Sequence, residues 1–137
     1  MADDEAFLHD VYDMLHIFGD KWTIPVMVAL SDGPLRPSEI LSRVNGYRVD
    51  ENWPDRHAVL HDSILARSLA RMTAIGLLSR TSADSFPPKV IYALEPPATE
   101  FLELLAHAFG WPRQHAEVVS RAQVFHLGRK AAGDPSR

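Results

Sequence analysis

The chain has 137 residues, of which 46% are hydrophobic and 23% charged, and it contains no cysteine. This length fits one domain with a single core, and without cysteine these residues form no disulfide, thiolate metal site or thiol redox sensor. No apolar run approaches the roughly 18 residues of a membrane span. The acidic first residues lack the features of a signal peptide, so we expect a cytoplasmic protein with no membrane partner.

The net charge of −4 is distributed unevenly along the chain. Residues 1–35 have one lysine and seven acids, residues 36–89 have eight basic and six acidic side chains, and residues 90–137 have five of each. The central segment is therefore the part of the chain best suited to contact phosphates.

Three helices are predicted in the first third of the chain. In residues 3–18 the apolar side chains recur three and four apart and acids occupy the first turn, which is typical of an amphipathic helix. A second helix is predicted for residues 20–30, with Asp20 as its cap. A short third helix of about two turns follows, which starts at Pro37 or Ser38 and stops at the Asn45-Gly46 pair.

The middle of the chain predicts a loop, a helix and a hairpin. Residues 47–59 are polar, have no steady period and carry Trp53 at their centre, so we predict a loop. Apolar residues recur at helical spacing over residues 62–75. Residues 77–81 and 90–94 predict two short strands that a turn-rich segment joins into a β-hairpin.

Two more helices are predicted, at residues 99–110 and 113–129. The predicted fold is therefore mainly α with a small β-hairpin, in the α+β class. We expect a single domain over residues 1–130 and a flexible tail at residues 131–137.

Four segments of the chain carry a resemblance to a known family. They are Gly19-Asp20-Lys21-Trp22, Gly33-Pro34-Leu35-Arg36 with Ser38-Glu39-Ile40, the stretch from Leu69 to Arg80, and the stretch from Pro87 to Leu94. Through them the chain resembles the HxlR-type regulators, relatives of the MarR-type winged helix proteins. The resemblance implies a winged helix-turn-helix core at residues 19–95, homodimerisation through terminal helices at residues 3–18 and 98–130, and binding of duplex operator DNA without a cofactor.

The chain departs from the family pattern in three places. It lacks the reactive cysteine that many members carry near the N-terminus, and Pro37 replaces a phenylalanine that is usual there. Residues 47–60 are also longer than the usual tight turn before the recognition helix.

The helix at residues 62–75 would enter the major groove of DNA. Arg67 on its outward face is the main candidate for a base or phosphate contact, because a guanidinium binds guanine bidentately. Basic side chains beside the hairpin and at the start of the third helix are candidates for phosphate contacts. The other predicted DNA-binding residues are Arg36, Ser38, Ser63, Ser68, Arg71, Arg80 and Lys89.

Aromatic side chains and two histidines indicate a candidate site for a small aromatic ligand. The candidates are Trp22, Trp53, His57, His61, Phe109 and Trp111, and core packing is the alternative for Trp22. His57 and His61 are spaced to share one helix face, but no third ligand accompanies them, so we predict no metal site.

Two functions remain open. The first is a dimeric DNA-binding transcriptional regulator that responds to a small molecule, and the resemblance with Arg67, Arg80 and Lys89 favours it. The alternative is a winged helix protein that has lost DNA binding and binds, or acts on, an aromatic metabolite. The overall acidity, the alanines of the recognition helix, Asp62 and the long loop favour the alternative. We identify no catalytic triad, glycine-rich phosphate loop or paired carboxylates, and enzymatic activity is not our expectation.

Overall fold

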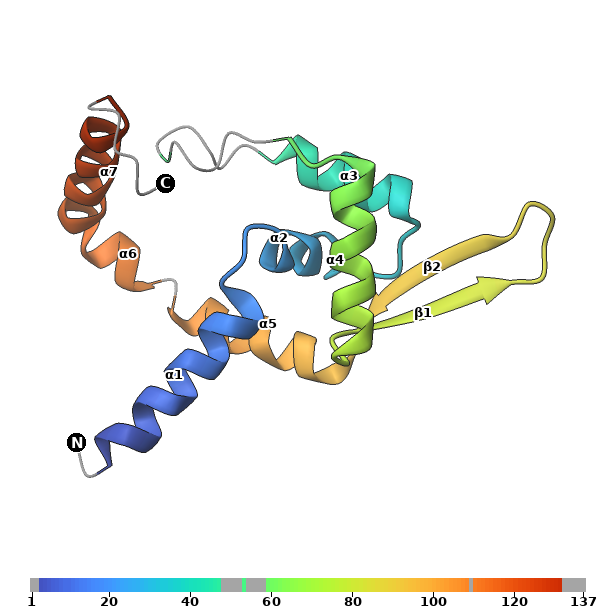
Figure 1. Ribbon diagram of the computed structural model, residues 1–137, viewed down its shortest axis with the longest axis horizontal. Helices are drawn as coiled ribbons and strands as arrows, with labels where there is room; N and C mark the ends of the chain where they lie inside the picture. The colour runs from blue at the N-terminus through green and yellow to red at the C-terminus, as the bar shows by residue number, and fades with distance from the viewer. Residues whose placement is uncertain (1–2, 48–52, 54–58, 109, 132–137) are drawn as a thin grey trace.

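The computed structural model describes residues 3–47, 53, 59–108 and 110–131. Seven helices and two strands lie in this part of the chain, and the predicted mainly α fold with one β-hairpin is confirmed (Figure 1). In chain order they are α1 (Asp4–Phe18), α2 (Thr23–Ala29), α3 (Pro37–Gly46), α4 (Asp62–Ala74), β1 (Leu78–Ala83), β2 (Lys89–Leu94), α5 (Pro96–Ala108), α6 (Gly110–Gln114) and α7 (Ala116–Ala131). Among the described residues, no helix is long and apolar enough to cross a membrane.

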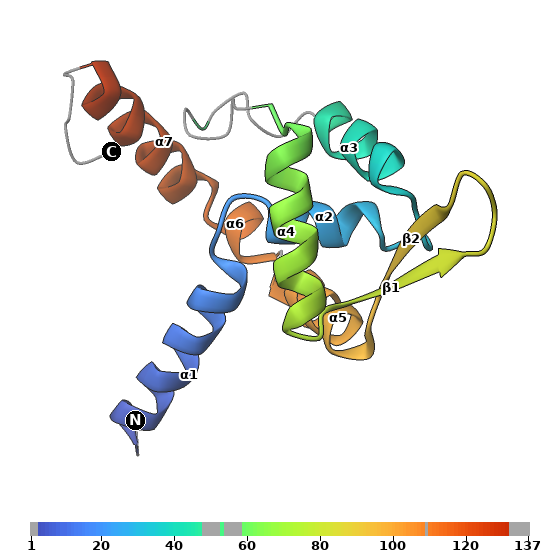
Figure 2. The same ribbon diagram turned by 45° about the vertical axis from the view of Figure 1, so that its right-hand side comes forward.

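The first helix, α1, projects from the rest of the molecule (Figures 1 and 2). Its start is capped by Asp3, whose carboxylate accepts a hydrogen bond from the amide of Ala6 at 3.0 Å. None of the residues of α1, all of which are described, is buried. The last residue of the helix contacts the body of the protein, because the ring of Phe18 stacks on that of Phe101 in α5 with centroids 3.6 Å apart.

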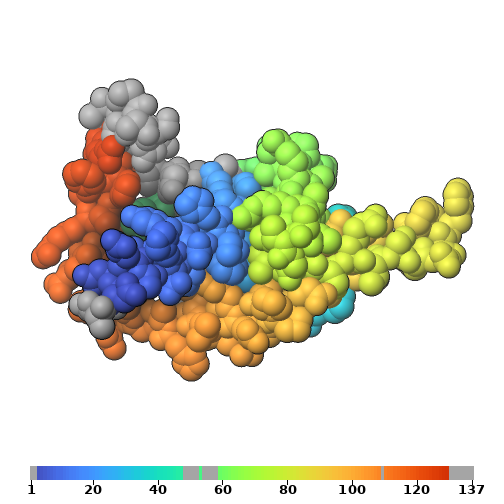
Figure 3. All heavy atoms as spheres, turned by 60° about the horizontal axis from the view of Figure 1, so that its bottom comes forward, coloured from blue at the N-terminus to red at the C-terminus, as the bar shows by residue number. Residues whose placement is uncertain are grey.

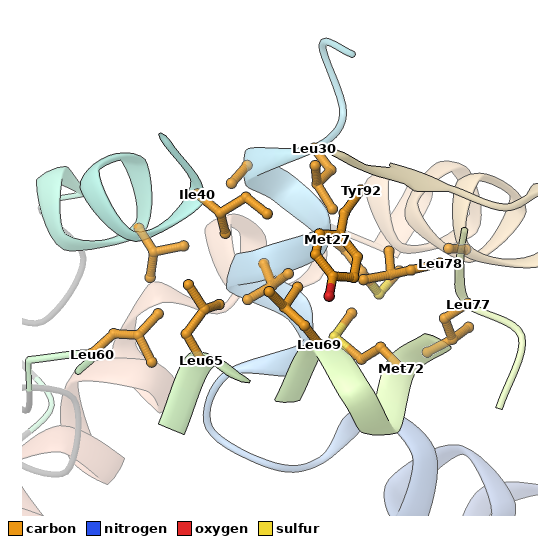
Figure 4. Close-up of a cluster of buried hydrophobic side chains, with 14 residues drawn as sticks. Met27, Leu30, Ile40, Leu60, Leu65, Leu69, Met72, Leu77, Leu78 and Tyr92 are labelled. Carbon is orange, nitrogen blue, oxygen red and sulfur yellow. The ribbon is translucent and has the colours of Figure 1, made fainter. Parts of the chain in front are cut away.

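The core surrounds α2, which packs against α3 and α5. Side chains that recur at helical spacing in α2, α3 and α4 meet the inner end of the hairpin there (Figure 4). Tyr92 of β2 is buried in this cluster. The buried apolar residues are Val26, Met27, Ala29, Leu30, Ile40, Val44, Leu60, Leu65, Leu69, Met72, Leu77, Leu78, Tyr92 and Ala98.

Strands β1 and β2 form an antiparallel hairpin with a register from Leu78↔Leu94 to Ala83↔Lys89. The first strand continues two residues beyond the predicted end, because its turn-forming residues still pair with the second strand. Leu35 adds a short third pairing, since its amide and carbonyl exchange hydrogen bonds with those of Tyr92 at 3.0 and 2.9 Å. This pairing joins the segment before α3 to the hairpin.

The ends of the predicted loop are held together by one side chain. The amide of Asn45 donates to the carbonyl of Leu60 at 3.0 Å, and the backbone amide of Leu60 donates back to Oδ1 of Asn45 at 2.9 Å. Leu60 is buried. Asn45 therefore keeps the end of α3 next to the start of α4, although residues 46–59 separate them in the chain.

We expect Asn45→Ala to lower the free energy of unfolding by about 1–3 kcal/mol, because it leaves two backbone groups of Leu60 without partners. Urea unfolding of the variant and of Ser42→Ala, an exposed position on the same helix, measures the effect. Equal midpoints for Asn45→Ala and wild type would show that the two hydrogen bonds contribute nothing.

The C-terminal helices differ from the prediction at two points. Helix α5 begins at Pro96 rather than at Thr99, because prolines are tolerated in a first helical turn, where their missing amide has no partner to lose. The predicted helix at residues 113–129 is divided into α6 and α7, which His115 separates.

Candidate nucleic-acid interface

Helices α3 and α4 are in contact, as in a helix-turn-helix, and the hairpin extends from the same side of the molecule (Figures 1 and 2). The core-facing residues of α4 are Leu65, Leu69 and Met72. This spacing leaves the opposite side of α4 in solvent. The helix is followed by Gly76 at φ +86°, a left-handed conformation that glycine adopts without a side-chain clash, and the chain turns there into the hairpin.

Three exposed cations lie on α4 and on the two strands of the hairpin. They are Arg67 on α4, Arg80 on β1 and Lys89 at the start of β2. Within the described ranges, none of them forms an ion pair or hydrogen bond through its side chain. Their charges are therefore available to an anionic partner.

The fourth predicted cation, Arg36, is partly neutralised. Its Nε lies 3.1 Å from a carboxylate oxygen of Glu39, which also accepts a hydrogen bond from the amide of Arg36 at 3.0 Å. The backbone hydrogen bond, followed by the guanidinium, lowers the pKa of Glu39 below its ordinary value. Arg36 and Lys89 nevertheless line one surface hollow, together with Pro34, Leu35, Glu39 and Ile91.

The predicted serines differ in accessibility. Ser38 and Ser63 are exposed in the first turns of α3 and α4, whereas Ser68 is half-buried. Ser38 and Ser63 are therefore accessible to a DNA duplex at the N-termini of α3 and α4, and Ser68 is less accessible.

A family model described as HxlR-like helix-turn-helix matches residues 17–120. The chain belongs to this family. It is a winged helix-turn-helix transcriptional regulator of HxlR type, as the resemblance implied.

Relatives of this HxlR-type regulator agree with the assignment. An HTH-type transcriptional regulator of Methanothermobacter thermautotrophicus is 28% identical over 115 residues, which cover 84% of this chain and 77% of the relative. A MarR-family transcriptional regulator of Enterococcus faecalis superposes with a TM-score of 0.66 at 23% identity, over 87% of this chain and 94% of that one. The redox regulator HypR in its reduced form gives a TM-score of 0.61 at 20% identity, over 82% and 98% of the two chains. At these identities the two structures show a shared fold.

Arg71 on the recognition helix of the HxlR-type regulator contacts other helices of its own chain. Its Nη2 donates to the carbonyls of His16 and Ile17 at 3.0 and 3.2 Å, and its Nη1 donates to the hydroxyl of Thr23 at 3.4 Å. Nη1 also lies 3.9 Å from Oδ1 of Asp20. The helical pattern predicts Arg71 among the DNA-binding residues, whereas the structure places its guanidinium at the junction of α1 and α2.

Helix α2 begins at Thr23, not at residue 20 as predicted, and its N-cap residue is Trp22 rather than Asp20. The carboxylate of Asp20 nevertheless lies at the start of the helix. Its Oδ2 accepts hydrogen bonds from the amides of Trp22 and Thr23, both at 3.2 Å, and Oδ1 accepts one from the hydroxyl of Thr23. Partial burial opposes ionisation, but the Thr23 hydroxyl, the two amides and the charge of Arg71 outweigh it and hold the pKa of Asp20 below its ordinary value of 3.8.

Because the pKa of Asp20 is lower in the folded than in the unfolded protein, its carboxylate stabilises the folded state at pH values above the unfolded-state pKa. That stabilisation is lost as the pH falls through the folded-state pKa. We therefore expect Asp20→Asn to be less stable than wild type at pH 6 and to lose less further stability on acidification to pH 3. Thermal unfolding at both pH values measures this, with Asp13→Asn on the exposed surface of α1 as a control for net charge. Parallel losses in wild type and Asp20→Asn would contradict it.

The predicted ligand-binding residues have different surroundings. Trp22 packs partly against the core, the ring of Trp53 meets His126 of α7 edge-on at 5.7 Å, and Trp111 lies 4.9 Å from the ring of His115. In the described part of the chain, no ring contact joins the three tryptophans. His61 is exposed before α4, and His57 and Phe109 lie outside the described residues.

Phe86 is a fully exposed aromatic residue that is absent from the predicted site. It belongs to the turn between β1 and β2, which projects farthest from the body in Figure 3, and its side chain is 100% exposed. A phenylalanine inside a turn-forming segment was the available signal, because such segments are otherwise polar.

Proposed function

We propose that the protein binds operator DNA as a cytoplasmic homodimer, with α4 in the major groove and the hairpin against the neighbouring backbone. The observation that carries this proposal is the set of three exposed cations without a partner in the described chain, Arg67, Arg80 and Lys89. Phosphate contacts hold a protein in register on the duplex, and base contacts supply the specificity. We assign the base contact to Arg67 and phosphate contacts to Arg80 and Lys89.

The start of α3 would add to the backbone contacts. Arg36 shares a surface hollow with Lys89, so a phosphate placed there meets two cations, one of them already paired with Glu39. Ser38 and Ser63 are in the first turns of α3 and α4, where free backbone amides also favour phosphate. Ser68 is the least accessible of the predicted contacts.

Dimerisation is supported by apolar surface on the terminal helices. Helices α1 and α7 lie on the side of the molecule opposite to the hairpin (Figures 1 and 2), and each exposes large apolar side chains that one small core leaves uncovered. Those that are more than 40% exposed are Phe7, Leu8, Tyr12, Met14 and Leu15 on α1, and Val118, Val124, Phe125 and Leu127 on α7. A two-fold interface between such faces would bury them.

The proposed signal is a small molecule. HypR is a redox regulator by its name, but these 137 residues contain no cysteine, so they cannot respond by oxidation of a thiol. An aromatic ligand that packs near Trp22, Trp53 or Trp111 could act as an effector without thiol chemistry.

Binding to the promoter of the protein's own gene tests the proposal. We expect the folded wild-type dimer to prefer this DNA over an unrelated duplex of equal length, and its affinity to fall steeply between 50 and 200 mM salt as counterions are no longer released favourably. A folded dimer that shows no preference even at low salt would overturn the proposal. Tryptophan fluorescence that responds to aromatic metabolites in the same preparation would then support the alternative function.

A further inference from the structure

Arg71 connects α4, which is proposed to bind DNA, with α1, which is proposed to form the dimer interface. It belongs to α4, the recognition helix, yet its guanidinium is hydrogen-bonded to the last residues of α1, the proposed dimerisation helix. The same group reaches Thr23 and Asp20 at the start of α2. This side chain of α4 therefore contacts two other helices, α1 and α2.

The contact with α1 is chemically specific. His16 and Ile17 are among the last four residues of α1, whose carbonyls have no partner inside the helix. These carbonyls form the negative end of the helix dipole, where a cation is stabilising. Arg71 satisfies both of them, so the end of α1 is fixed relative to α4.

Few other contacts hold α1 in place. No residue of this fully described helix is buried, and its other large contact is the stacking of Phe18 on Phe101 of α5. A single stacked pair allows rotation about the contact, whereas the planar guanidinium has donors in a fixed fork. Asp20 and Thr23 hold the second edge of this fork, and Asp20 is itself fixed by the amides of α2.

We propose that Arg71 is a positioning residue that sets the angle between α1 and α4, and through it the spacing of the half-sites that the dimer accepts. This inference rests on the proposed function. In a two-fold dimer the recognition helices must be separated by about one DNA turn, or roughly 34–36 Å. If α1 lies in the dimer interface and α4 in the groove, the angle between them determines that separation.

Arg71→Lys tests the inference, because it keeps the charge and removes the fork. The affinities of wild type and Arg71→Lys are measured for the promoter operator with its native half-site spacing, and for operators with one to four base pairs inserted between the half-sites. Wild type should prefer the native spacing, and we expect Arg71→Lys to reduce that preference at least about fivefold, a typical coupling between two sites. Its salt dependence should stay that of wild type.

Two results would overturn the inference. In the first, Arg71→Lys weakens binding equally at all spacings and Arg71→Ala lowers the salt slope by about one for each phosphate that is no longer bound, which would identify Arg71 as a phosphate-binding residue. In the second, both variants unfold at lower urea concentration while they keep the spacing preference of wild type, which would leave Arg71 a purely structural role. Wild type without any preference for promoter DNA would instead refute the proposed function itself, and the inference with it.

A measurement without DNA separates these cases further. Because the chain has no cysteine, Asp13→Cys on α1 and Ala66→Cys on α4 introduce unique thiols for spin labels at exposed positions. Labelled chains are diluted with unlabelled ones so that distances within one protomer dominate. We expect one narrow distance distribution with Arg71 and a broader one with Arg71→Lys. Equal widths would contradict a positioning role.

Discussion

Leu15→Glu is expected to convert the proposed dimer into a monomer and to reduce operator affinity by about 10²–10⁴-fold, the advantage of two linked binding sites. Leu15 is 58% exposed in the protomer, so the substitution leaves the core intact. In a dimer interface, however, the new carboxylate would be buried without a partner, which costs about 3–5 kcal/mol in each protomer. The dimer should therefore dissociate while the protomer stays folded.

Light scattering at micromolar concentration measures whether the variant is monomeric, and circular dichroism measures whether it stays folded. His9→Glu is the matched control, because it adds the same group to the polar side of α1 and should leave the dimer and its DNA affinity unchanged. A wild-type protein that is monomeric at this concentration would refute the dimer. A dimeric Leu15→Glu with full DNA affinity would place the interface on α7 alone.

Arg67→Ala is expected to lower the affinity for the promoter by about 1–3 kcal/mol while binding to unrelated duplex changes little. The guanidinium is exposed on the outer side of α4 and has no partner in the described chain, so its removal should not affect folding. The difference between the two DNAs identifies a base contact. If Arg67 binds a phosphate instead, both affinities should fall equally and the salt slope should decrease by about one for each phosphate that the variant no longer neutralises.

Arg113→Ala is the control for the change in net charge, because it removes an exposed arginine from α6, away from the hairpin. Both variants are compared with wild type at two salt concentrations, on the promoter and on unrelated duplex. Equal affinities of Arg67→Ala and wild type on both DNAs would exclude Arg67 from the interface. The recognition surface would then have to be sought on the hairpin and the start of α3.

The helices of the fold could be predicted because their signals are local. The cap Asp3, the carboxylate of Asp20 just before α2, and the three- and four-residue spacing of apolar side chains act within one or two helical turns. The predictions failed where two local signals compete. The prolines of α5 indicated a break, although a first turn accepts them, and the helix expected at residues 113–129 is interrupted at His115.

The candidate interface could be predicted only in part. The positions of Arg67, Arg80 and Lys89 follow from the order of helix and hairpin. Arg71 has the same residue type and lies one turn beyond Arg67 on α4, so the pattern gave it the same role. Its partners at residues 16 and 17 are more than 50 positions away in the sequence, and helical periodicity contains no information about them.

The side chain of Asn45 has a consequence for how this regulator can change over time. Because the amide group holds α3 and α4 together at Leu60, the orientation of the two helices does not depend on the length of the peptide between them. Doubling such a connection costs only about 0.6 kcal/mol in closure entropy. New sequence can therefore be added or exchanged between residues 47 and 59 while the two helices keep their arrangement, and a sensing segment can be acquired there without redesign of the DNA-binding unit.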